Sequence, residues 1–140
     1  MGNERQNIYV RKAIEIATLA HKGQVDKQGV DYIQHPLRVM AAVDGDLEKI
    51  VAILHDTLED TEETEETLLA KGIPQEAIDK VKILTRGEDE TYDEYVERVS
   101  KDVICRKIKL ADLQDNLRDG CPESLQKRYK KAQAFLMGVQ

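Results

Sequence analysis

Apolar residues recur every three or four positions through most of the chain, and this pattern constrains the fold more than any other feature. The two longest series are Val10, Ala13, Ile14, Ala17 and Ala20, and Leu47, Ile50, Val51, Leu54 and Leu58. Such spacing puts apolar side chains on one face of an α-helix. Shorter series follow, two of them behind Pro74 and Pro122, and proline suits the first turn of a helix. No strand pattern competes, so the chain is predicted to be helical.

The polar stretches between the predicted helices are short, and none is long enough to be a domain linker. A chain of 140 residues can form one ordinary hydrophobic core but not two comfortable ones. We therefore predict an all-α fold with a single domain over residues 1–140, built as a bundle of about six or seven helices. The acidic run EDTEETEET, residues 59–67, is predicted to be a solvated helix entry that its Thr and Glu residues cap.

Charge and composition narrow the class of protein. The net charge of −6 and the pI near 5.1 argue against a general phosphate-backbone binder, so no nucleic-acid partner is expected. The N-terminal segment MGNERQNIYV lacks the apolar run of a signal peptide, and no apolar stretch approaches the ~20 residues of a membrane span. We expect a soluble, cytoplasmic protein without a membrane partner. Cys105 and Cys121 form no CxxC pair and are interpreted as free, reduced thiols. No oligomeric state follows from the sequence.

The segment LHDTLEDT, from Leu54 to Thr61, gathers ionisable groups inside the second long apolar series. His55 and Asp56 are followed one turn later by Glu59 and Asp60, so a continuous helix would place these groups beside one another. Like charges at that spacing destabilise a helix unless water or a cation compensates them. A divalent metal ion is the natural partner. The alternative is an exposed acidic helix end whose negative pole His55 satisfies.

Two further segments offer partners for this group. In DYIQHPL, His35 stands directly before Pro36, so it should lie at a helix start with its side chain free to face inward as a second nitrogen ligand. In IKLADLQDNL, Lys109, Asp112 and Asn116 share one helical face. That face can supply one oxygen ligand and two substrate contacts. Taken alone, it is more simply read as an ordinary solvated face.

Together, His35, His55, Asp56 and Asp112 reproduce the H…HD…D signature of the HD-domain metal-dependent phosphohydrolases, which the chain resembles. More specifically, it is similar to the hydrolase domain of the RelA/SpoT family and to stand-alone small alarmone hydrolases. The resemblance rests on five segments in order, AHKGQ, DYIQHPL, LHDTLEDT, LTR and KLADLQDNLRD, and runs from about Ala13 to Asp119. A two-residue HD motif is weak by itself, whereas five ordered segments are specific.

The resemblance implies one divalent metal ion, most simply manganese, held by the two histidines and two aspartates of the signature. Such a mixed nitrogen and oxygen set suits a borderline or hard divalent ion and leaves positions for water and a phosphate oxygen. No histidine lies between Asp56 and Asp112, so a mononuclear centre is expected. The remaining histidine, His21, stands near a predicted helix end, where a capping or packing role is expected.

The resemblance also implies roles for other residues. Glu59 or Asp60 would orient the attacking water and take its proton, while the metal ion polarises a phosphoryl oxygen. Lys27 matches a basic residue near the substrate phosphates. Asn116 would hydrogen-bond the nucleotide sugar or phosphate, and Lys109 would pair with a carboxylate or steady the substrate.

The implied activity is hydrolysis of a small phosphorylated nucleotide, namely removal of the 3′-pyrophosphate of (p)ppGpp. Two positions depart from the family pattern: Asp26 replaces an arginine that stacks on guanine, and Leu113 replaces a basic residue. These departures leave open the same metal chemistry on another nucleotide or a dinucleotide phosphate. A non-enzymatic nucleotide-binding module is the third alternative, and it is less favoured because no predicted ligand or base is missing.

Overall fold

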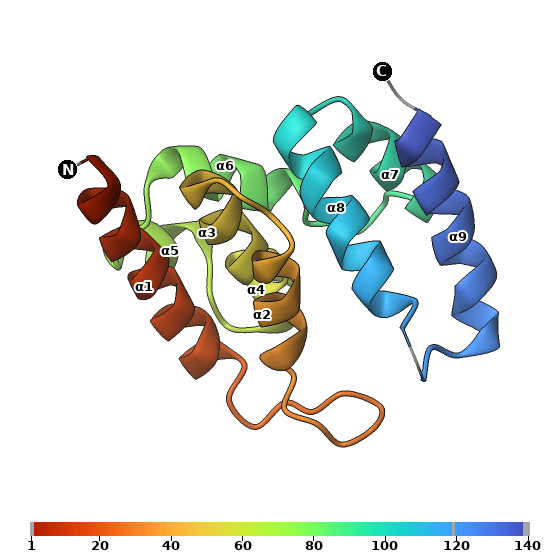
Figure 1. Cartoon of the computed structure of the whole chain (residues 1–140), viewed down its shortest axis with the longest axis horizontal. Coiled ribbons are helices and arrows are strands. Elements are labelled where there is room, and N and C mark those ends of the chain that lie inside the picture. The colour runs from red at the N-terminus through yellow and green to blue at the C-terminus, as the bar shows by residue number, and fades with distance from the viewer. Residues whose placement is uncertain (1, 119, 139–140) are drawn as a thin grey trace.

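The computed structural model describes residues 2–118 and 120–138, with side chains described from residue 8 onward. The helices are α1 (Gly2–Ala20), α2 (Gln34–Ala41), α3 (Asp46–Leu54), α4 (Thr57–Asp60), α5 (Glu65–Ala70), α6 (Gln75–Ile83), α7 (Tyr92–Ser100), α8 (Val103–Asn116) and α9 (Glu123–Gly138). The all-α prediction is confirmed (Figure 1). The predicted domain, residues 1–140, and the segment KLADLQDNLRD also include residues that lie outside the described part, namely 1, 119, 139 and 140.

The described residues form more helices than the six or seven predicted. One reason is that the helix predicted around Leu47–Leu58 is broken into two. The backbone leaves the helix at His55 and Asp56, between α3 and α4. There Thr57 Oγ1 donates a hydrogen bond to the Leu54 carbonyl at 2.7 Å, and His55 Nδ1 donates to the Ala52 carbonyl at 2.6 Å. Side-chain donors thus occupy carbonyls that a continuing helix would use. The expectation that His55, Asp56 and the acids beyond them share one uninterrupted helix is therefore wrong.

Helix starts follow the capping residues that the sequence indicates. Thr64 and Thr67 form a reciprocal capping box at α5, which confirms the capping expected inside the acidic run. Pro74 immediately precedes α6, and Pro36 lies in the first turn of α2. His35 therefore begins a helix, as predicted, and its side chain is buried.

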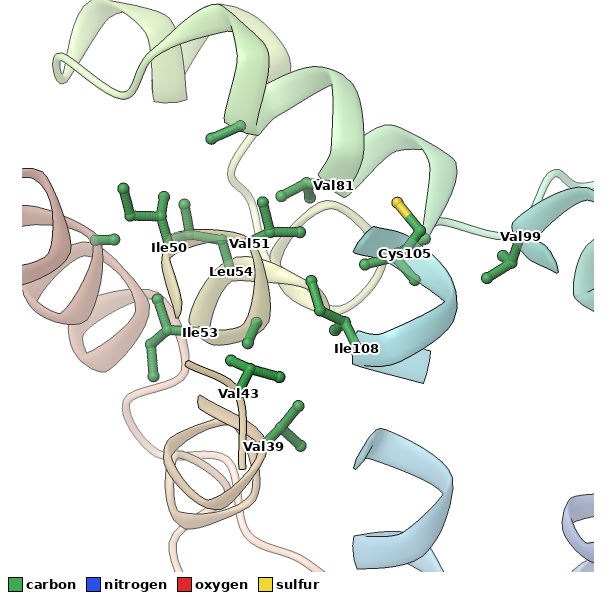
Figure 2. Close-up of a cluster of buried hydrophobic side chains, with 14 of the residues drawn as sticks. Val39, Val43, Ile50, Val51, Ile53, Leu54, Val81, Val99, Cys105 and Ile108 are labelled. Atoms are coloured by element: carbon green, nitrogen blue, oxygen red, sulfur yellow. The ribbon is translucent and has the colours of Figure 1, made fainter. Parts of the chain in front are cut away.

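Helix α3 lies at the centre of the bundle, and its residues Ile50–Leu54 are all buried. It packs against α1, α2, α6 and α8, while α8 also packs against α7 and α9 (Figure 1). Figure 2 shows the core around α3, to which α6 contributes Val81 and α8 contributes Ile108. Helix α8 therefore connects α2, α3 and α6, from the first part of the chain, with α7 and α9, from the last part.

Two other sequence expectations concern cysteines and membranes. Cys105 is buried and Cys121 is half-buried, and both are free thiols. Within residues 2–118 and 120–138, no helix combines the length and the apolar character needed to cross a membrane.

The central position of α3 predicts a large penalty for truncating its core side chains. Ile53 is fully buried, so Ile53→Ala should lower the free energy of unfolding by about 2–5 kcal/mol. Leu19→Ala is the matched control, because Leu19 is 72% exposed and its truncation should change stability by less than about 0.5 kcal/mol. Urea denaturation measures both variants. Equal losses would contradict a core centred on α3.

Candidate metal centre

Two histidines and two aspartates from separate segments converge in the middle of the bundle. His35 comes from α2, His55 and Asp56 from the break between α3 and α4, and Asp112 from α8. Asp112 Oδ1 lies 2.8 Å from His35 Nε2 and 3.2 Å from His55 Nε2. Asp56 Oδ2 lies 3.7 Å from His35 Nε2 and 3.1 Å from His55 Nε2. The sequence prediction thus selected residues that do meet in space.

These four atoms form a ring whose dimensions suit one metal ion. Adjacent ligands at about 2.1 Å from a single ion lie about 3 to 3.5 Å apart, close to the four nitrogen–oxygen distances in this ring. His35, His55 and Asp56 offer ligand atoms that all lie within 4.8 Å of one another. Asp112 lies outside this group of three, but its Oδ1 contacts the Nε2 atoms of both imidazoles. Two imidazoles with two carboxylates are a donor set that divalent first-row metals accept.

Both histidines present the correct nitrogen. His55 Nδ1 must carry a proton, because its partner is the Ala52 carbonyl, which can only accept a hydrogen bond. His35 Nδ1 lies 2.6 Å from Asp115 Oδ2 and donates to that carboxylate. The Nε2 atoms are thereby left to face the ring, which is how metal-binding histidines are commonly oriented.

The carboxylates of the ring attract positive charge. Burial lowers the pKa of His35, but hydrogen bonds to Asp112 and Asp115 outweigh it and raise the value to about 9. For Asp112, burial raises the pKa, yet Lys109 and both imidazoles hold it well below its usual range. The centre therefore binds positive charge either as protons on the imidazoles or as a bound cation.

Neighbouring side chains fix the two aspartates. Tyr32 donates its hydroxyl to Asp56 Oδ2 at 2.6 Å. Lys109 is buried and donates to Asp112 Oδ2 at 2.8 Å, while Asn116 Nδ2 donates to Asp112 Oδ1 at 3.3 Å. Of the two roles considered for Lys109, the structure gives it the carboxylate pairing. Sequence reasoning missed Tyr32, although it stands three residues before His35.

Asp115 is the second residue that sequence reasoning missed. It accepts the His35 Nδ1 hydrogen bond and also binds the guanidinium of Arg38, with Nε at 2.7 Å and Nη2 at 3.0 Å. Burial raises its pKa, but His35 and Arg38 lower it to about 2, so the carboxylate stays charged. The available signal was its helical spacing, because Asp115 follows Asp112 by three residues on α8.

The two predicted water-activating acids, Glu59 and Asp60, lie on α4 with exposed side chains. Glu59 Oε1 accepts the backbone N–H of Arg86 at 2.5 Å, and the Asp60 carbonyl accepts Gln24 Nε2 at 2.8 Å. Partial desolvation and the nearby charge of Asp56 raise the pKa of both carboxyl groups. Among the described residues, no hydrogen bond joins either carboxylate to the ring, so their catalytic role stays a prediction.

A cleft of about 320 Å³ opens beside His35. Lys27 and Asn116 line it, as their predicted substrate roles require. Arg38 and Arg118 line it as well, although sequence reasoning had selected neither. The cleft therefore combines several cationic side chains with one edge of the ring of four donor atoms.

The two departures from the family pattern have structural explanations. Asp26 lines the cleft, but its Oδ1 accepts the backbone N–H groups of Val30 at 3.0 Å and Gln28 at 2.8 Å. These bonds lower its pKa and hold the turn between α1 and α2. Leu113 is fully buried in the hydrophobic core, so it packs the bundle rather than facing a ligand. Asp26 therefore has a structural role of its own in this turn, at the position where the family has an arginine.

His21 is also buried, and in the described structure its side chain makes no hydrogen bond to the four residues of the candidate metal centre. Its Nδ1 pairs with Gln24 Oε1 at 2.9 Å, and its ring lies 5.0 Å from that of Tyr32. These contacts agree with the packing role expected for it.

No family model matches the chain. Comparison with known proteins nevertheless finds relatives that are named as GTP pyrophosphokinases and as guanosine-3′,5′-bis(diphosphate) 3′-pyrophosphohydrolases. A GTP pyrophosphokinase of Streptomyces coelicolor is 36% identical over 141 residues, covering 91% of this chain and 16% of that protein. A guanosine-3′,5′-bis(diphosphate) 3′-pyrophosphohydrolase of Haemophilus influenzae is 35% identical over 119 residues, covering 74% of this chain and 17% of that protein. The Escherichia coli bifunctional (p)ppGpp synthase/hydrolase SpoT is 32% identical over 123 residues, covering 78% and 18%. The chain thus spans about one sixth of the length of these relatives.

A solved structure of a metazoan SpoT orthologue that hydrolyses ppGpp has the same fold. The TM-score is 0.77 at 24% identity, and the match covers 94% of this chain and 87% of that one. The helical architecture is therefore shared along nearly the whole chain.

The contact between His35 and Asp115 predicts that Asp115 supports metal binding without touching the ion. Asp115→Asn should weaken Mn²⁺ binding about 10- to 100-fold, because the amide lacks the charge that orients the His35 ring. Asp56→Ala should abolish binding, and Asp93→Asn is the control, because the Asp93 side chain is 74% exposed in a surface pair with Lys131. Titration calorimetry with Mn²⁺ measures all three. Wild-type Mn²⁺ affinity in Asp115→Asn would show that Asp115 does not support metal binding.

Proposed function

Because its homologues are (p)ppGpp synthases and hydrolases of the SpoT/RelA kind, we propose that this chain is an HD-type phosphohydrolase that removes the 3′-pyrophosphate of (p)ppGpp. The observation that carries the proposal is the ring of four donor atoms beside a cleft lined with cationic side chains. We take the ion to be a single Mn²⁺, as the resemblance to the family implies, and the two imidazoles and two carboxylates form a mixed nitrogen and oxygen set that can accept it. The cytoplasmic location expected from the sequence stays a prediction.

In this proposal His35, His55, Asp56 and Asp112 hold the ion. When bound, the ion supplies positive charge that polarises a phosphoryl oxygen and lowers the pKa of the attacking water. Glu59 or Asp60 accepts the proton of that water. Their raised pKa values suit this task, because a general base works best when its pKa lies nearer the working pH.

The cleft residues would bind the rest of the substrate. Lys27 and Arg118 offer positive charge to phosphate oxygens, and Arg38 adds charge while it remains bound to Asp115. Asn116 stands between the ring and the cleft, because it donates to Asp112 and also lines the cleft. It can therefore relate the position of the nucleotide to that of the metal-binding carboxylate.

A second candidate substrate class rests on Asp26. Its carboxylate is committed to two backbone N–H groups of the turn, so this position offers no planar cation on which a guanine base could stack. That observation favours another nucleotide or a dinucleotide phosphate as the runner-up. A non-enzymatic binding module is disfavoured, since every ligand and base of the proposed chemistry is present.

A release assay distinguishes these possibilities. We predict that Mn²⁺-loaded protein liberates pyrophosphate from ppGpp and pppGpp, and that chelation by EDTA abolishes the activity. Ordinary nucleotides and dinucleotide phosphates are assayed in parallel for phosphate and pyrophosphate. Efficient turnover of one of these with no reaction on ppGpp would replace the proposed substrate by the runner-up. No release from any of them, with Mn²⁺ bound, would favour the binding module.

The proposed base predicts a specific kinetic defect. Glu59→Gln keeps the shape of the side chain but loses the proton acceptor, so kcat should fall by about 100-fold or more while KM and Mn²⁺ affinity stay unchanged. Glu66→Gln on the neighbouring helix α5 is the control, and it should keep wild-type kcat. Steady-state kinetics with ppGpp and calorimetry with Mn²⁺ test this. An unchanged kcat in Glu59→Gln would show that Glu59 is not the general base, and Asp60 would then be the remaining candidate.

A further inference from the structure

The carboxylate of Glu59 is held by a backbone group from a distant part of the chain. Its Oε1 accepts the N–H of Arg86 at 2.5 Å, across the loop that joins α6 to α7. This N–H belongs to the peptide group between Thr85 and Arg86. The carbonyl oxygen of the same peptide accepts a hydrogen bond from Arg98 Nη2 at 3.1 Å. One peptide unit therefore connects the Arg98 side chain to Glu59.

Side chains of α7 hold the end of α6 at three successive carbonyls. Arg98 Nη1 donates to the Ile83 carbonyl at 2.8 Å, and Tyr95 donates its hydroxyl to the Leu84 carbonyl at 2.6 Å. Arg98 Nη2 adds the bond to Thr85. The last carbonyls of a helix have no backbone partner within it, so these donors decide how the following residues are oriented.

Arg98 is itself held in place by Glu90. Its Nε lies 2.7 Å from Glu90 Oε2, and its Nη2 lies 2.9 Å from Glu90 Oε1. Hydrogen bonds from Arg98 and Gly87 lower the pKa of Glu90 to about 2, so the pair is charged. Such a two-point contact fixes the plane of the guanidinium, which a lysine ammonium cannot reproduce.

The geometry of the peptide group converts this support into an orientation of Arg86. A trans peptide is planar, and its N–H points opposite to its C=O. When Arg98 fixes the Thr85 carbonyl, it also fixes the direction of the Arg86 N–H, which then meets Glu59. A hydrogen bond on the carbonyl further polarises the peptide and strengthens its N–H as a donor.

We propose that Arg98 is a positioning residue for hydrolysis, acting on Glu59 through the Thr85–Arg86 peptide group. Arg98 is not among the residues that line the cleft, and its hydrogen bonds in the described structure go to Glu90 and to the Ile83 and Thr85 carbonyls, not to the four residues of the ring. Its effect is to hold one oxygen of the Glu59 carboxylate so that the other is free to accept the proton of the attacking water. The contacts that orient Glu59 do not depend on the substrate, whereas their effect on the rate rests on the proposed function.

The orientation is tested by NMR without any turnover. Glu59→Gln should move the Arg86 amide proton to higher field, because a neutral acceptor replaces a charged one. Arg98→Lys should move the same resonance in the same direction, and Glu90→Gln, which loosens Arg98, is a second variant should Arg98→Lys fold poorly. Lys80→Met is the matched control, because it breaks the α6 ion pair with Asp102 and leaves the Arg86 peptide alone. An Arg86 resonance that both Arg98→Lys and Glu90→Gln leave unmoved overturns the proposal.

The kinetic test uses Mn²⁺-loaded protein and ppGpp. Arg98→Lys should lower kcat by about 10- to 100-fold with unchanged KM, because a displaced general base loses its alignment. Its pH profile should also change. Weakening the hydrogen bond from the Arg86 N–H reduces an interaction that lowers the pKa of Glu59, so that pKa rises and the acid limb of kcat moves to higher pH.

A double-mutant cycle separates action through Glu59 from general damage. In a Glu59→Gln background, Arg98→Lys should cost less than 2-fold, because the group it positions is already inactive. Full additivity of the two losses would overturn the proposal, and so would a wild-type kcat in Arg98→Lys. If wild-type protein does not hydrolyse ppGpp, the proposed function fails, whereas the Arg86 resonance still decides whether Arg98 orients Glu59.

Discussion

Two carboxylates, the buried Asp112 and the half-buried Asp56, meet between the helices of an apolar bundle, and the side chains around them compensate their charge. A buried carboxylate costs several kcal/mol unless charges and hydrogen bonds compensate it. Here the compensation comes from two imidazoles, the Lys109 ammonium and the Tyr32 hydroxyl. Removing any of these partners leaves negative charge in a region of low polarity. The requirement for a compensating cation is therefore built into the core.

The helices that carry these groups accommodate them in two ways. The helix predicted around Leu47–Leu58 is interrupted, whereas α8 carries polar side chains on one face. The break between α3 and α4 brings His55 and Asp56 to the centre, and side-chain hydrogen bonds to helix carbonyls stabilise the break. Helix α8 instead stays continuous and presents one polar face, with Asp112 and Asp115 on successive turns. Ile108, one turn before Asp112 on the same side of the helix, and Leu113, on a different side, are both buried in the apolar core. One helix thus supplies both the hydrophobic centre and the polar face.

Local sequence was informative wherever local forces decide the structure. The apolar spacing in α1 and α3 predicts their buried faces, and His35 begins a helix beside Pro36 as expected. The break after Leu54 was not predicted, because periodicity continues through it and only the competition of side chains for carbonyls ends the helix. Asp115 escaped notice for a different reason: its partner His35 lies 80 positions away, and only the fold brings them together. Asp26 shows that matching one position to a family does not reveal which backbone groups its side chain binds.

The four residues of the candidate metal centre lie far apart along the chain, and this spacing would affect the stability of the folded protein if an ion binds them. His35 and Asp112 are separated by 77 positions, so an ion held by both is a non-covalent cross-link between α2 and α8. Closing so long a loop is entropically costly for an unfolded chain. The unfolded chain also lacks a preformed site, so the free energy of ion binding adds to the stability of the native state alone. An ion bound at this centre would therefore also stabilise the folded state, by an amount that grows with the concentration of the free ion.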